Sequence, residues 1–336
     1  MASRPQVDLE LAAFLEHRPL LFSIAYRMMA SVVDAEDIVQ EAYLRWTTAV
    51  SKQDVRNAKS LLVAITTRLC IDEWKKARRK REVYIGSNLP EPIPTTMLQP
   101  ATQDDRIDFA FLLLLEQLKP IERAVFLLKQ VFDYSYSEIA AIVKKSEVAC
   151  RQICSRARRS INVNCKPTVT EKRQEQLLQK YLEAIMAGDG RLLLSIINSD
   201  AQLVSDGGGI VHSSRRRLNG RIAISAFLFG IIRKAHYSRI QLYKASINNM
   251  PAIVIYESNR PVMLQCFDTA ATIQTVYSIQ NPYKLALFMK RDNLISTGVL
   301  KPVRLGIQIQ LQWFWNRIVN QKITAPMLRI MQNHMS

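Results

Sequence analysis

Apolar residues recur three or four positions apart through residues 9–83, a stretch that contains no glycine. The same spacing returns over residues 107–163. Such spacing places the apolar side chains on one face of a helix. Between the two stretches lie Gly86 and four prolines within residues 90–100, and proline cannot continue a helix. The pattern therefore predicts two helical blocks joined by a proline-rich linker.

The pattern changes after residue 171. Two further stretches keep helical spacing, residues 174–187 and 191–197, and residues 201–205 then indicate a strand. The remaining segments follow in the order turn 206–209, helix 221–234, and strands 239–247, 252–256 and 272–279. Helices and strands mixed in this way favour an α+β unit. We therefore expect a multidomain protein with two all-α domains followed by an α+β domain.

The second helical block contains a helix-turn-helix pattern at residues 134–160. Residues 118–128 predict a helix that is entered through Pro120, a residue favoured in the first turn. A short helix is expected over residues 137–143 with Ser137 as its cap, and a third helix begins with Ser146 as cap after a two-residue turn. In this motif the second helix of the pair enters the major groove of DNA.

The third helix separates into two faces. Small or apolar residues at steps of four, three and four predict the inner face: Cys150, Cys154, Ala157 and Ile161. The outer face carries Ala149, Arg151, Gln152, Ser155 and Arg156, with Arg158 and Arg159 at the end. We expect Arg151 and Gln152 to touch base edges and the trailing arginines to hold phosphates. A merely solvated helix face is the alternative, and the turn architecture favours DNA.

An acidic helix surface is predicted in the first block, over residues 34–46. Asp34 stands at the expected N-cap, and the outer surface consists of Asp34, Glu36, Asp37 and Glu41. A solvated surface is the simplest interpretation. A docking surface for a basic protein partner is the alternative.

The next helix, residues 59–81, ends in six cations: Lys75, Lys76, Arg78, Arg79, Lys80 and Arg81. Such a cluster binds phosphates without reading sequence, although cations also suit a helix C-terminus. Trp46 and Trp74 are expected to pack in the core, with stacking on exposed bases as the alternative.

Charge and composition narrow the partners. The chain has 46 basic and 29 acidic residues, a net charge of +17, which attracts polyanions. No signal-peptide core is seen near the start, and the most apolar run, residues 109–118, is too short for a membrane span. The five cysteines lack zinc-ligand spacing. We therefore expect a cytoplasmic protein with no membrane partner, metal or cofactor, and nucleic acid as its leading partner.

Three stretches together resemble extracytoplasmic-function (ECF) sigma factors of RNA polymerase. Residues 34–46 (DAEDIVQEAYLRW) resemble the helix that binds the polymerase clamp, and residues 61–82 (LLVAITTRLCIDEWKKARRKRE) resemble the helix that reads the −10 element. Residues 118–161 (LKPIERAVFLLKQVFDYSYSEIAAIVKKSEVACRQICSRARRSI) resemble the domain that reads the −35 element. The resemblance implies core RNA polymerase and promoter DNA as partners. It assigns polymerase binding to Asp34, Glu36, Asp37, Gln40 and Glu41.

Three shorter motifs resemble the ECF subgroup that carries a C-terminal SnoaL-like domain, a cone-shaped fold related to nuclear transport factor 2. They are Leu89-Pro90-Glu91-Pro92, Asp206-Gly207-Gly208-Gly209 and Asn281-Pro282-Tyr283-Lys284-Leu285. The sequence departs from the subgroup pattern at Asn88, where tryptophan is usual, and at Tyr283, where an acid is usual. The resemblance implies that this domain modulates the sigma factor through contacts among the three motifs.

The resemblance also implies the domain bounds. They are residues 8–84 for sigma domain 2, 85–106 for the linker, 107–165 for sigma domain 4, 171–294 for the SnoaL-like domain and 295–336 for a tail of unknown role.

Two other functions remain open from the sequence. One is a helix-turn-helix transcriptional regulator fused to a SnoaL-like domain that binds an unidentified small molecule. The other is an enzyme, because such cones can use carboxylate or histidine bases, for which the candidates are Asp206, His212, His236 and Asp268. Their spacing defines no catalytic site, so we expect no catalysis.

Overall fold

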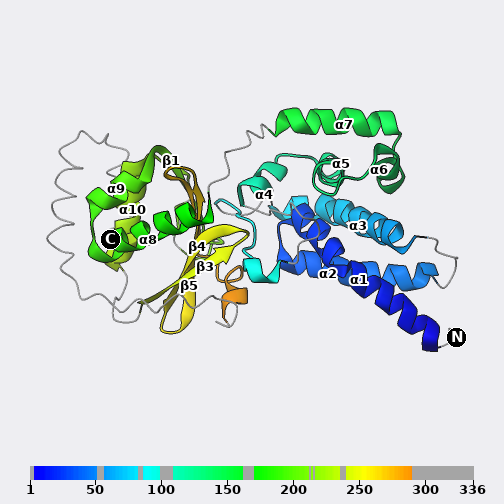
Figure 1. Cartoon of the computed structure of the whole chain (residues 1–336), viewed down its shortest axis with the longest axis horizontal. Coiled ribbons are helices and arrows are strands. Elements are labelled where there is room, and N and C mark those ends of the chain that lie inside the picture. The colour runs from blue at the N-terminus through cyan, green and yellow to red at the C-terminus, as the bar shows by residue number, and fades with distance from the viewer. Residues whose placement is uncertain are drawn as a thin grey trace. The chain divides into compact units, whose positions relative to one another are not determined.

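The computed structural model describes residues 4–50, 57–81, 86–98, 109–161, 170–211, 213–214, 216–234 and 240–289. These residues form two compact units, and each is described by itself (Figure 1). The first unit contains the two helical blocks, and the second contains the α+β part. The linker changes unit between Leu89, which belongs to the second, and Pro90, which belongs to the first.

The first unit contains both predicted helical blocks. Its helices are α1 (Arg4–Met29), α2 (Val32–Val50), α3 (Ala58–Arg81), α4 (Phe109–Leu115), α5 (Pro120–Gln130), α6 (Tyr136–Val143) and α7 (Glu147–Ser160), with a 3-10 turn at Thr95–Met97. One hydrophobic core joins the two blocks, from Ile24 and Leu62 to Leu127 and Ile139, and it also includes Ile93 of the linker. The linker is therefore part of the packed interior of this unit.

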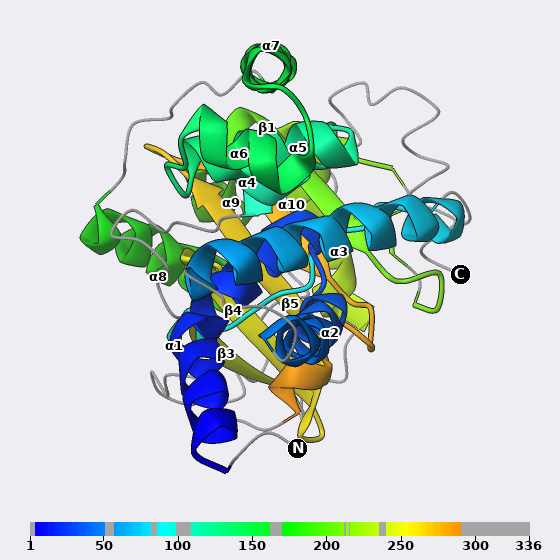
Figure 2. The same ribbon diagram turned by 90° about the vertical axis from the view of Figure 1, so that its right-hand side faces the viewer.

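Two arginines connect the blocks through backbone carbonyls. Arg68 of α3 donates from Nε to the Ile142 carbonyl and from Nη2 to the Ala141 carbonyl, each at 2.8 Å. Both carbonyls lie at the C-terminal end of α6, where a cation is stabilised by the helix dipole. The buried Arg123 of α5 donates to the Met28 carbonyl at 2.5 Å and to the Leu115 carbonyl at 2.9 Å. As a result α3 crosses against α5 and α6, while α7 lies on the opposite side of those helices (Figure 1 and Figure 2).

The second unit packs helices against a six-stranded sheet. Its helices are α8 (Glu171–Ala187), α9 (Gly190–Ile196) and α10 (Arg221–Lys234), with a 3-10 turn at Ala286–Phe288. Its strands are β1 (Ile197–Asp206), β2 (Leu218–Asn219), β3 (Ile240–Ile247), β4 (Met250–Glu257), β5 (Arg260–Thr269) and β6 (Ile273–Ile279). The order is β2-β1-β6-β5-β4-β3, in which only the β1–β6 pair is parallel. The predicted α+β architecture is confirmed.

Strand β5 was not predicted from the sequence. Its buried residues form a continuous run from Met263 to Phe267 instead of alternating, so it lacks the period of two that marks a half-exposed strand. The missed signal was the two-residue turn before it. Ser258 and Asn259 both have positive φ, 48° and 68°, as a tight hairpin turn requires. Asn248 and Asn249, with φ of 50° and 58°, make the preceding hairpin in the same way.

Candidate nucleic-acid interface

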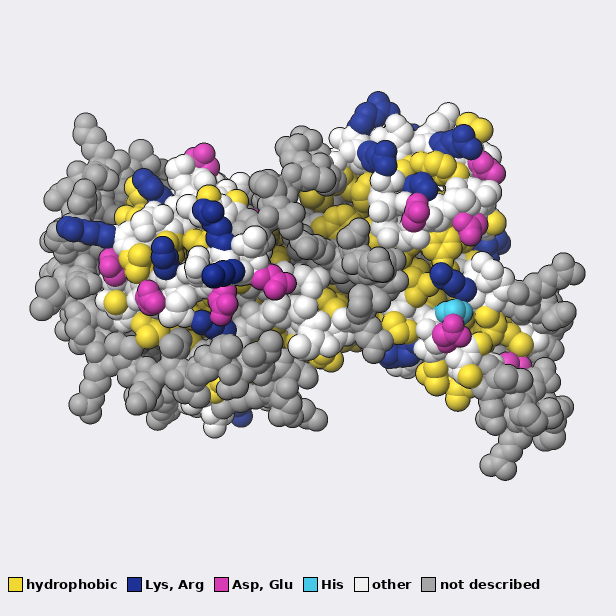
Figure 3. All heavy atoms as spheres, viewed as in Figure 1, with side chains coloured by type: hydrophobic (Ala, Val, Ile, Leu, Met, Phe, Trp, Pro, Cys, Tyr) yellow, Lys and Arg dark blue, Asp and Glu magenta, His cyan; other side chains and the backbone are white. Residues whose placement is uncertain are grey.

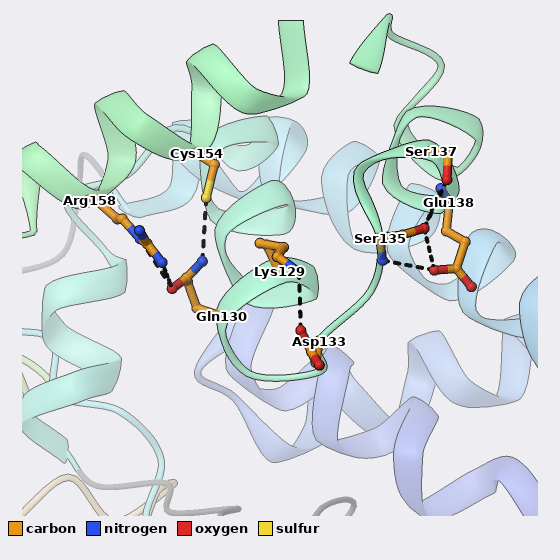
Figure 4. A network of polar contacts seen from close by, with 8 residues as sticks. All are labelled: Lys129, Gln130, Asp133, Ser135, Ser137, Glu138, Cys154 and Arg158. Carbon is orange, nitrogen blue, oxygen red and sulfur yellow. Dashed lines mark hydrogen bonds and ion pairs between the residues drawn. The ribbon is translucent and has the colours of Figure 1, made fainter. Parts of the chain in front are cut away.

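The start of α6 is fixed by a reciprocal cap. The Ser135 hydroxyl accepts the Glu138 amide at 3.3 Å, and the Glu138 carboxylate accepts the Ser135 amide at 2.8 Å (Figure 4). The expected cap at Ser137 was wrong, because Ser137 lies inside the first turn of α6. Ser135 has Glu138 three positions later, as a capping box requires, whereas Ala140 stands at that position for Ser137. Hydrogen bonds from Ser135 lower the pKa of the Glu138 carboxyl.

The turn between α6 and α7 matches the helix-turn-helix prediction. Lys144 ends α6 in the left-handed conformation, with φ of 54°. Ser146 then caps α7, its hydroxyl accepting the Ala149 amide at 3.2 Å, as expected. The inner face of α7 is confirmed, since Cys150, Cys154, Ala157 and Ile161 are all buried. The thiols of Cys150 and Cys154 are therefore small core groups, as expected.

The outer face of α7 is a cationic surface. Every charged or polar residue predicted to read DNA there is exposed: Arg151, Gln152, Ser155, Arg156, Arg158 and Arg159. Lys and Arg side chains gather over this helix on the face drawn in Figure 3. Because the opposite face is packed on α5 and α6, the surface is held rigidly and points away from the core.

Two of these arginines are oriented by neighbouring side chains. The Arg158 guanidinium donates to the Gln130 side-chain carbonyl, at 3.1 Å from Nε, and Gln130 in turn donates to the Cys154 sulfur at 3.6 Å (Figure 4). The Arg151 guanidinium lies 5.5 Å from the ring centre of Tyr136. Its Nη2 also donates to the exposed Glu147 carboxylate at 3.3 Å, so a contact with a base would replace that pair. Sequence reasoning missed Gln130 and Tyr136, because both act from other helices.

The basic end of α3 is only partly described. Lys75 and Lys76 are exposed, and they pair with Asp72 at 3.1 Å and Glu73 at 3.2 Å one turn earlier. Four more cations predicted to bind DNA, Arg78, Arg79, Lys80 and Arg81, belong to the same helix, and their side chains lie outside the described residues. The tryptophans are placed as expected in the packed unit: Trp46 is buried, and Trp74 lies under the Arg123 guanidinium, 5.2 Å from it.

The predicted acidic surface on α2 is present. Asp37 and Gln40 are exposed, whereas Glu36 accepts Arg18 at 2.5 Å and Glu41 accepts Arg45 at 2.8 Å. The expectation that Asp34 caps this helix was wrong. The Ser31 hydroxyl accepts the Asp34 amide at 3.2 Å, so Ser31 takes that role and Asp34 lies in the first turn of α2.

Exposed apolar side chains extend the α2 surface. Val33 and Leu44 are 62% and 59% exposed, and with Asp37 and Gln40 they follow steps of four, three and four along one stripe of the helix. Trp46 of the same helix is buried, whereas Leu44 is not. Large apolar groups beside carboxylates on an exposed stripe suit a protein partner better than solvent.

The linker is bound to the second unit through a buried ion pair. Asp206, fully buried, accepts the Leu89 amide at 3.0 Å and the Lys284 ammonium at 2.7 Å on one carboxylate oxygen. Its other oxygen accepts the Gly208 amide at 2.9 Å. Lys284 also donates to Asn88 at 2.6 Å and to the Leu89 carbonyl. The motifs at 88–89, 206–209 and 281–285 therefore meet at one place within this unit.

The glycine motif is required by this geometry. Gly208 has φ of 66°, and a Cβ there would lie 2.6 Å from the side-chain carbon of Asn281. A Cβ on Gly207 would lie 2.2 Å from the Val211 carbonyl. Asn281 is itself fixed, because its amide donates to the Asp206 carbonyl at 3.1 Å and its side chain accepts the Tyr283 amide at 3.0 Å. Leu285 is buried and Pro282 is exposed in the same loop.

The linker is bound equally closely within the first unit. The Glu91 amide donates to the Ala30 carbonyl at 2.9 Å, and the Glu91 carbonyl accepts the Tyr26 hydroxyl at 2.6 Å. The Glu91 carboxylate accepts the amide of Val32, the first residue of α2, at 2.7 Å. A carboxylate at that end is stabilised by the helix dipole. Pro90 and Pro92 are buried on either side of it.

A small apolar pocket lies between α8, α10 and strands β3–β5. It is lined by Tyr181, Leu182, Leu228, Ile253, Met263 and other apolar side chains, with Gln265 as a polar member. The Tyr181 hydroxyl donates to Gln265 at 2.8 Å, and burial raises the pKa of Tyr181. About 40 Å³ is open to the centre of a water-sized molecule, far less than drug-sized ligand sites offer. A small-molecule ligand thus remains a prediction.

Of the candidate acid–base residues, Asp206 is occupied by structural contacts, as described above. Asp268 lies on β5, and His212 and His236 lie outside the described residues. In the part of the chain that is described, no helix has the length and apolarity that crossing a bilayer requires.

Comparison with known proteins agrees with this architecture. The family model for Sigma-70 region 2 matches residues 13–80, and that for Sigma-70 region 4 matches residues 108–161. The ECF RNA polymerase sigma factor SigJ of Mycobacterium tuberculosis is 30% identical over 235 residues, which cover 67% of this chain and 74% of that relative. The probable ECF RNA polymerase sigma factor SigI of the same species is 35% identical over 199 residues, covering 57% of this chain and 68% of the relative.

A solved structure extends the likeness to the second unit. The crystal structure of SigJ from M. tuberculosis superposes with a TM-score of 0.65 at 26% identity, covering 82% of this chain and 98% of that one. The 82% of this chain that is covered is more than the two helical blocks alone occupy. Two promoter-reading helical regions followed by an α+β domain define a class of transcription-initiation factor. The chain belongs to the ECF family of RNA polymerase sigma factors.

Proposed function

We propose that this chain binds core RNA polymerase through α2 and reads promoters through α3 and α7, under the control of its second unit. Residues 8–84 act as sigma domain 2, residues 107–165 as sigma domain 4, and residues 171–294 as the regulatory domain. The observation that supports this best is the exposed cationic face of α7, presented by a capped helix-turn-helix in the second of two sigma regions. Polymerase works in the cytoplasm, so we place the protein there.

The polymerase contact is assigned to the exposed stripe of α2. Asp37 and Gln40 supply polar groups, and Val33 and Leu44 supply apolar area that is exposed in this structure. Asp34, Glu36 and Glu41 add negative charge that would attract a basic clamp surface. Burial of apolar area supplies most of the affinity in such contacts, while charge sets specificity and association rate.

Holoenzyme assembly tests this assignment. Reversing Asp37 and Glu41 to lysine should weaken capture of core polymerase by tagged protein at least tenfold, because like charges would face each other across the interface. Reversal of Glu175 and Glu183, both exposed on α8, to lysine provides the matched control with the same change of charge. Unchanged capture by the α2 variant would refute the assignment.

The arrangement of the first unit supports a regulatory role for the linker. The −10 and −35 elements are separated by about 25 base pairs, which is about 85 Å of duplex at 3.4 Å per pair. Helix α3 is assigned to the −10 element and contacts α6. Helix α6 packs on α7, which is assigned to the −35 element. While α3 contacts the α6–α7 helix-turn-helix, the two cannot reach both promoter elements at once. We infer that the described state is closed and that polymerase binding must separate α3 from α6.

We propose that a strap made of Leu89–Pro92 and the preceding Asn88 controls this opening. Its Asn88–Leu89 half is bound by the Asp206–Lys284 pair of the second unit, and Glu91 is bound at the α1–α2 corner of the first. A segment fixed at adjacent residues by two units restricts how far either can move. A passive spacer would instead lie exposed, whereas residues 89–94 are buried.

A further inference from the structure

Net positive charge is distributed unevenly along this chain. Residues 1–165, which hold both sigma regions, contain 24 basic and 20 acidic residues, whereas residues 166–336 contain 22 basic and 9 acidic ones. The half that carries the assigned DNA-reading helices is thus nearly neutral. Most of the net charge of +17 lies in the half to which no nucleic-acid contact has been assigned.

The imbalance is greatest within residues 201–256. This segment has eight basic residues and one acid, Asp206. Asp206 is buried and paired with Lys284, so it contributes no negative charge to the surface. The segment itself therefore supplies no surface acid to neutralise its cations.

Three of these cations occupy one exposed edge of the sheet. Arg216 and Arg217 directly precede β2, and Arg221 follows it at the start of α10. All three are exposed, and β2 is the edge strand of the six-stranded sheet. We call Arg216, Arg217 and Arg221 the arginine edge. Arg221 reaches the Leu194 carbonyl only at 3.5 Å, the outer limit for a hydrogen bond.

The sequence on either side of the arginine edge is predominantly positive. Within residues 190–222 the sequence has two acids, Asp206 and the exposed Asp200 on β1, against Arg191, Arg215 and the three arginines of the edge. Clustering of like charges costs free energy through mutual repulsion. An anionic partner would relieve that cost.

We propose that the arginine edge is a second DNA-binding surface, which holds phosphates of the duplex without reading its sequence. Guanidinium groups suit phosphates because they donate paired hydrogen bonds and stay charged. The proposal rests on the proposed function in one respect. The helix-turn-helix of the same chain brings DNA near, and tethering raises the effective concentration of DNA at a second, weaker surface.

A basic surface with apolar neighbours could also meet an anionic membrane. Ile210 and Ile222 flank the arginine edge and are 57% and 43% exposed. A membrane-binding surface usually adds aromatic or leucine anchors along an amphipathic helix. The arginine edge has isoleucines and a two-residue strand instead, so the observations favour DNA. The membrane becomes one outcome of the test.

The test measures the salt dependence of DNA binding by the full chain. In a triple Arg216→Gln, Arg217→Gln, Arg221→Gln variant, the slope of log affinity against log salt should fall by about 2 to 3, since each phosphate contact contributes about 0.9. Affinity for a duplex without a promoter should fall at least about tenfold at 0.1 M salt. The probe is a fluorescent 40-base-pair duplex of random sequence.

A matched control removes the same charge from α8. Lys172, Arg173 and Lys180 are exposed there among Glu171, Glu175 and Glu183, and cations and acids alternate over this helix in Figure 3. Their replacement by glutamine should leave the slope within about 0.5 of the parent value. Equal losses in both variants would mean general charge attraction and would overturn the proposal, as would an unchanged slope in the triple variant.

Two further measurements separate the alternatives. The first is binding to vesicles of three parts phosphatidylcholine and one part phosphatidylserine. If the triple variant lost vesicle binding but kept DNA binding, the arginine edge would be a membrane-binding surface and the proposal would be overturned. Single replacement of Arg216 should lower the slope by about 1, so the proposal remains testable if the triple variant misfolds. Failure of the parent chain to bind core polymerase would refute the proposed function and leave the slope difference unaffected.

Discussion

At the scale of single residues, the glycines of the 206–209 motif show how backbone geometry restricts sequence. Gly208 combines a left-handed φ with a close approach to Asn281. Any side chain there meets both penalties at once. The sequence predicts only a turn at Gly208, because Asn281, the residue that a side chain there would overlap, is distant in the sequence.

We expect Gly208→Ala to destabilise the second unit by about 2 kcal/mol or more, from strain and steric overlap. Gly230→Ala is the matched control. Gly230 lies within α10, and a Cβ there would meet nothing within 4 Å. This control should stabilise the unit by about 0.5–1 kcal/mol, since alanine is the better helix former. Chemical denaturation measures both, and equal effects would contradict the packing described.

The arginines of α7 are expected to differ in what they recognise. Arg151 lies near the start of the helix with its guanidinium against Tyr136, so Arg151→Ala should relax preference at one position of the −35 element by about 1–3 kcal/mol. Arg159→Ala should weaken all promoters alike and flatten the salt dependence. Binding measured across single-base variants distinguishes them. If both variants lost affinity in the same way across the single-base variants, base reading by Arg151 and phosphate binding by Arg159 could not be distinguished, and the assignment would fail.

At the scale of elements, the cap of α6 connects sequence to stability and pH. Hydrogen bonding to Ser135 lowers the pKa of Glu138, so the carboxylate form is preferred in the folded protein. Its stabilising contribution is therefore present above the ordinary glutamate pKa and is lost as pH falls through the lowered value. Glu138→Gln removes that pH dependence.

We expect Ser135→Ala to destabilise the first unit by about 1 kcal/mol and Ser137→Ala to change it by less than about 0.5 kcal/mol. Thermal unfolding at pH 7 and at pH 3 measures both. A larger loss from Ser137→Ala would show that the cap lies at that serine after all.

Much of the element order could be predicted from the sequence, because it follows from local signals. Helical spacing predicted α3, α5 and α7 closely, and Ser146 was found as a cap because its partner is three residues away. The contacts of Glu91 could not be found, since its carboxylate meets the Val32 amide across 59 residues. The side-chain partners Gln130 and Tyr136 of the α7 arginines were missed for the same reason.

At the scale of the whole molecule, simultaneous reading of the −10 and −35 elements requires the first unit to open. Arg68 is a main contact between the two readers, donating to two carbonyls at the end of α6. Arg68→Ala should therefore shift the chain toward the open state. Dyes placed through unnatural amino acids at the exposed positions Asp72 and Val148 report the separation of α3 and α7.

Energy transfer between these dyes should fall when core polymerase binds, and the Arg68→Ala variant should show part of that fall without polymerase. Lys76→Ala is the control, because Lys76 is exposed on α3 and pairs only within that helix in the described contacts, with Glu73; without polymerase it should leave transfer unchanged. Constant transfer on polymerase binding would mean that the closed arrangement persists in the holoenzyme, contrary to the account.

Removal of the second unit tests its regulatory role at the same scale. A chain ending near Cys165 lacks the Asp206–Lys284 pair that binds Leu89. We expect it to show lower energy transfer between the same dyes than the full chain. Identical transfer in the two proteins would leave the strap without a restraining role.

The most direct measurement is transcription from purified parts. Core RNA polymerase, a library of promoter fragments and this protein should yield discrete transcripts that core polymerase alone does not make. The start sites should share sequence elements about 10 and 35 base pairs upstream, and initiation should be lost when Asp37 and Glu41 are reversed to lysine. The account would be contradicted if the protein bound DNA yet directed no initiation with any core polymerase that captures it.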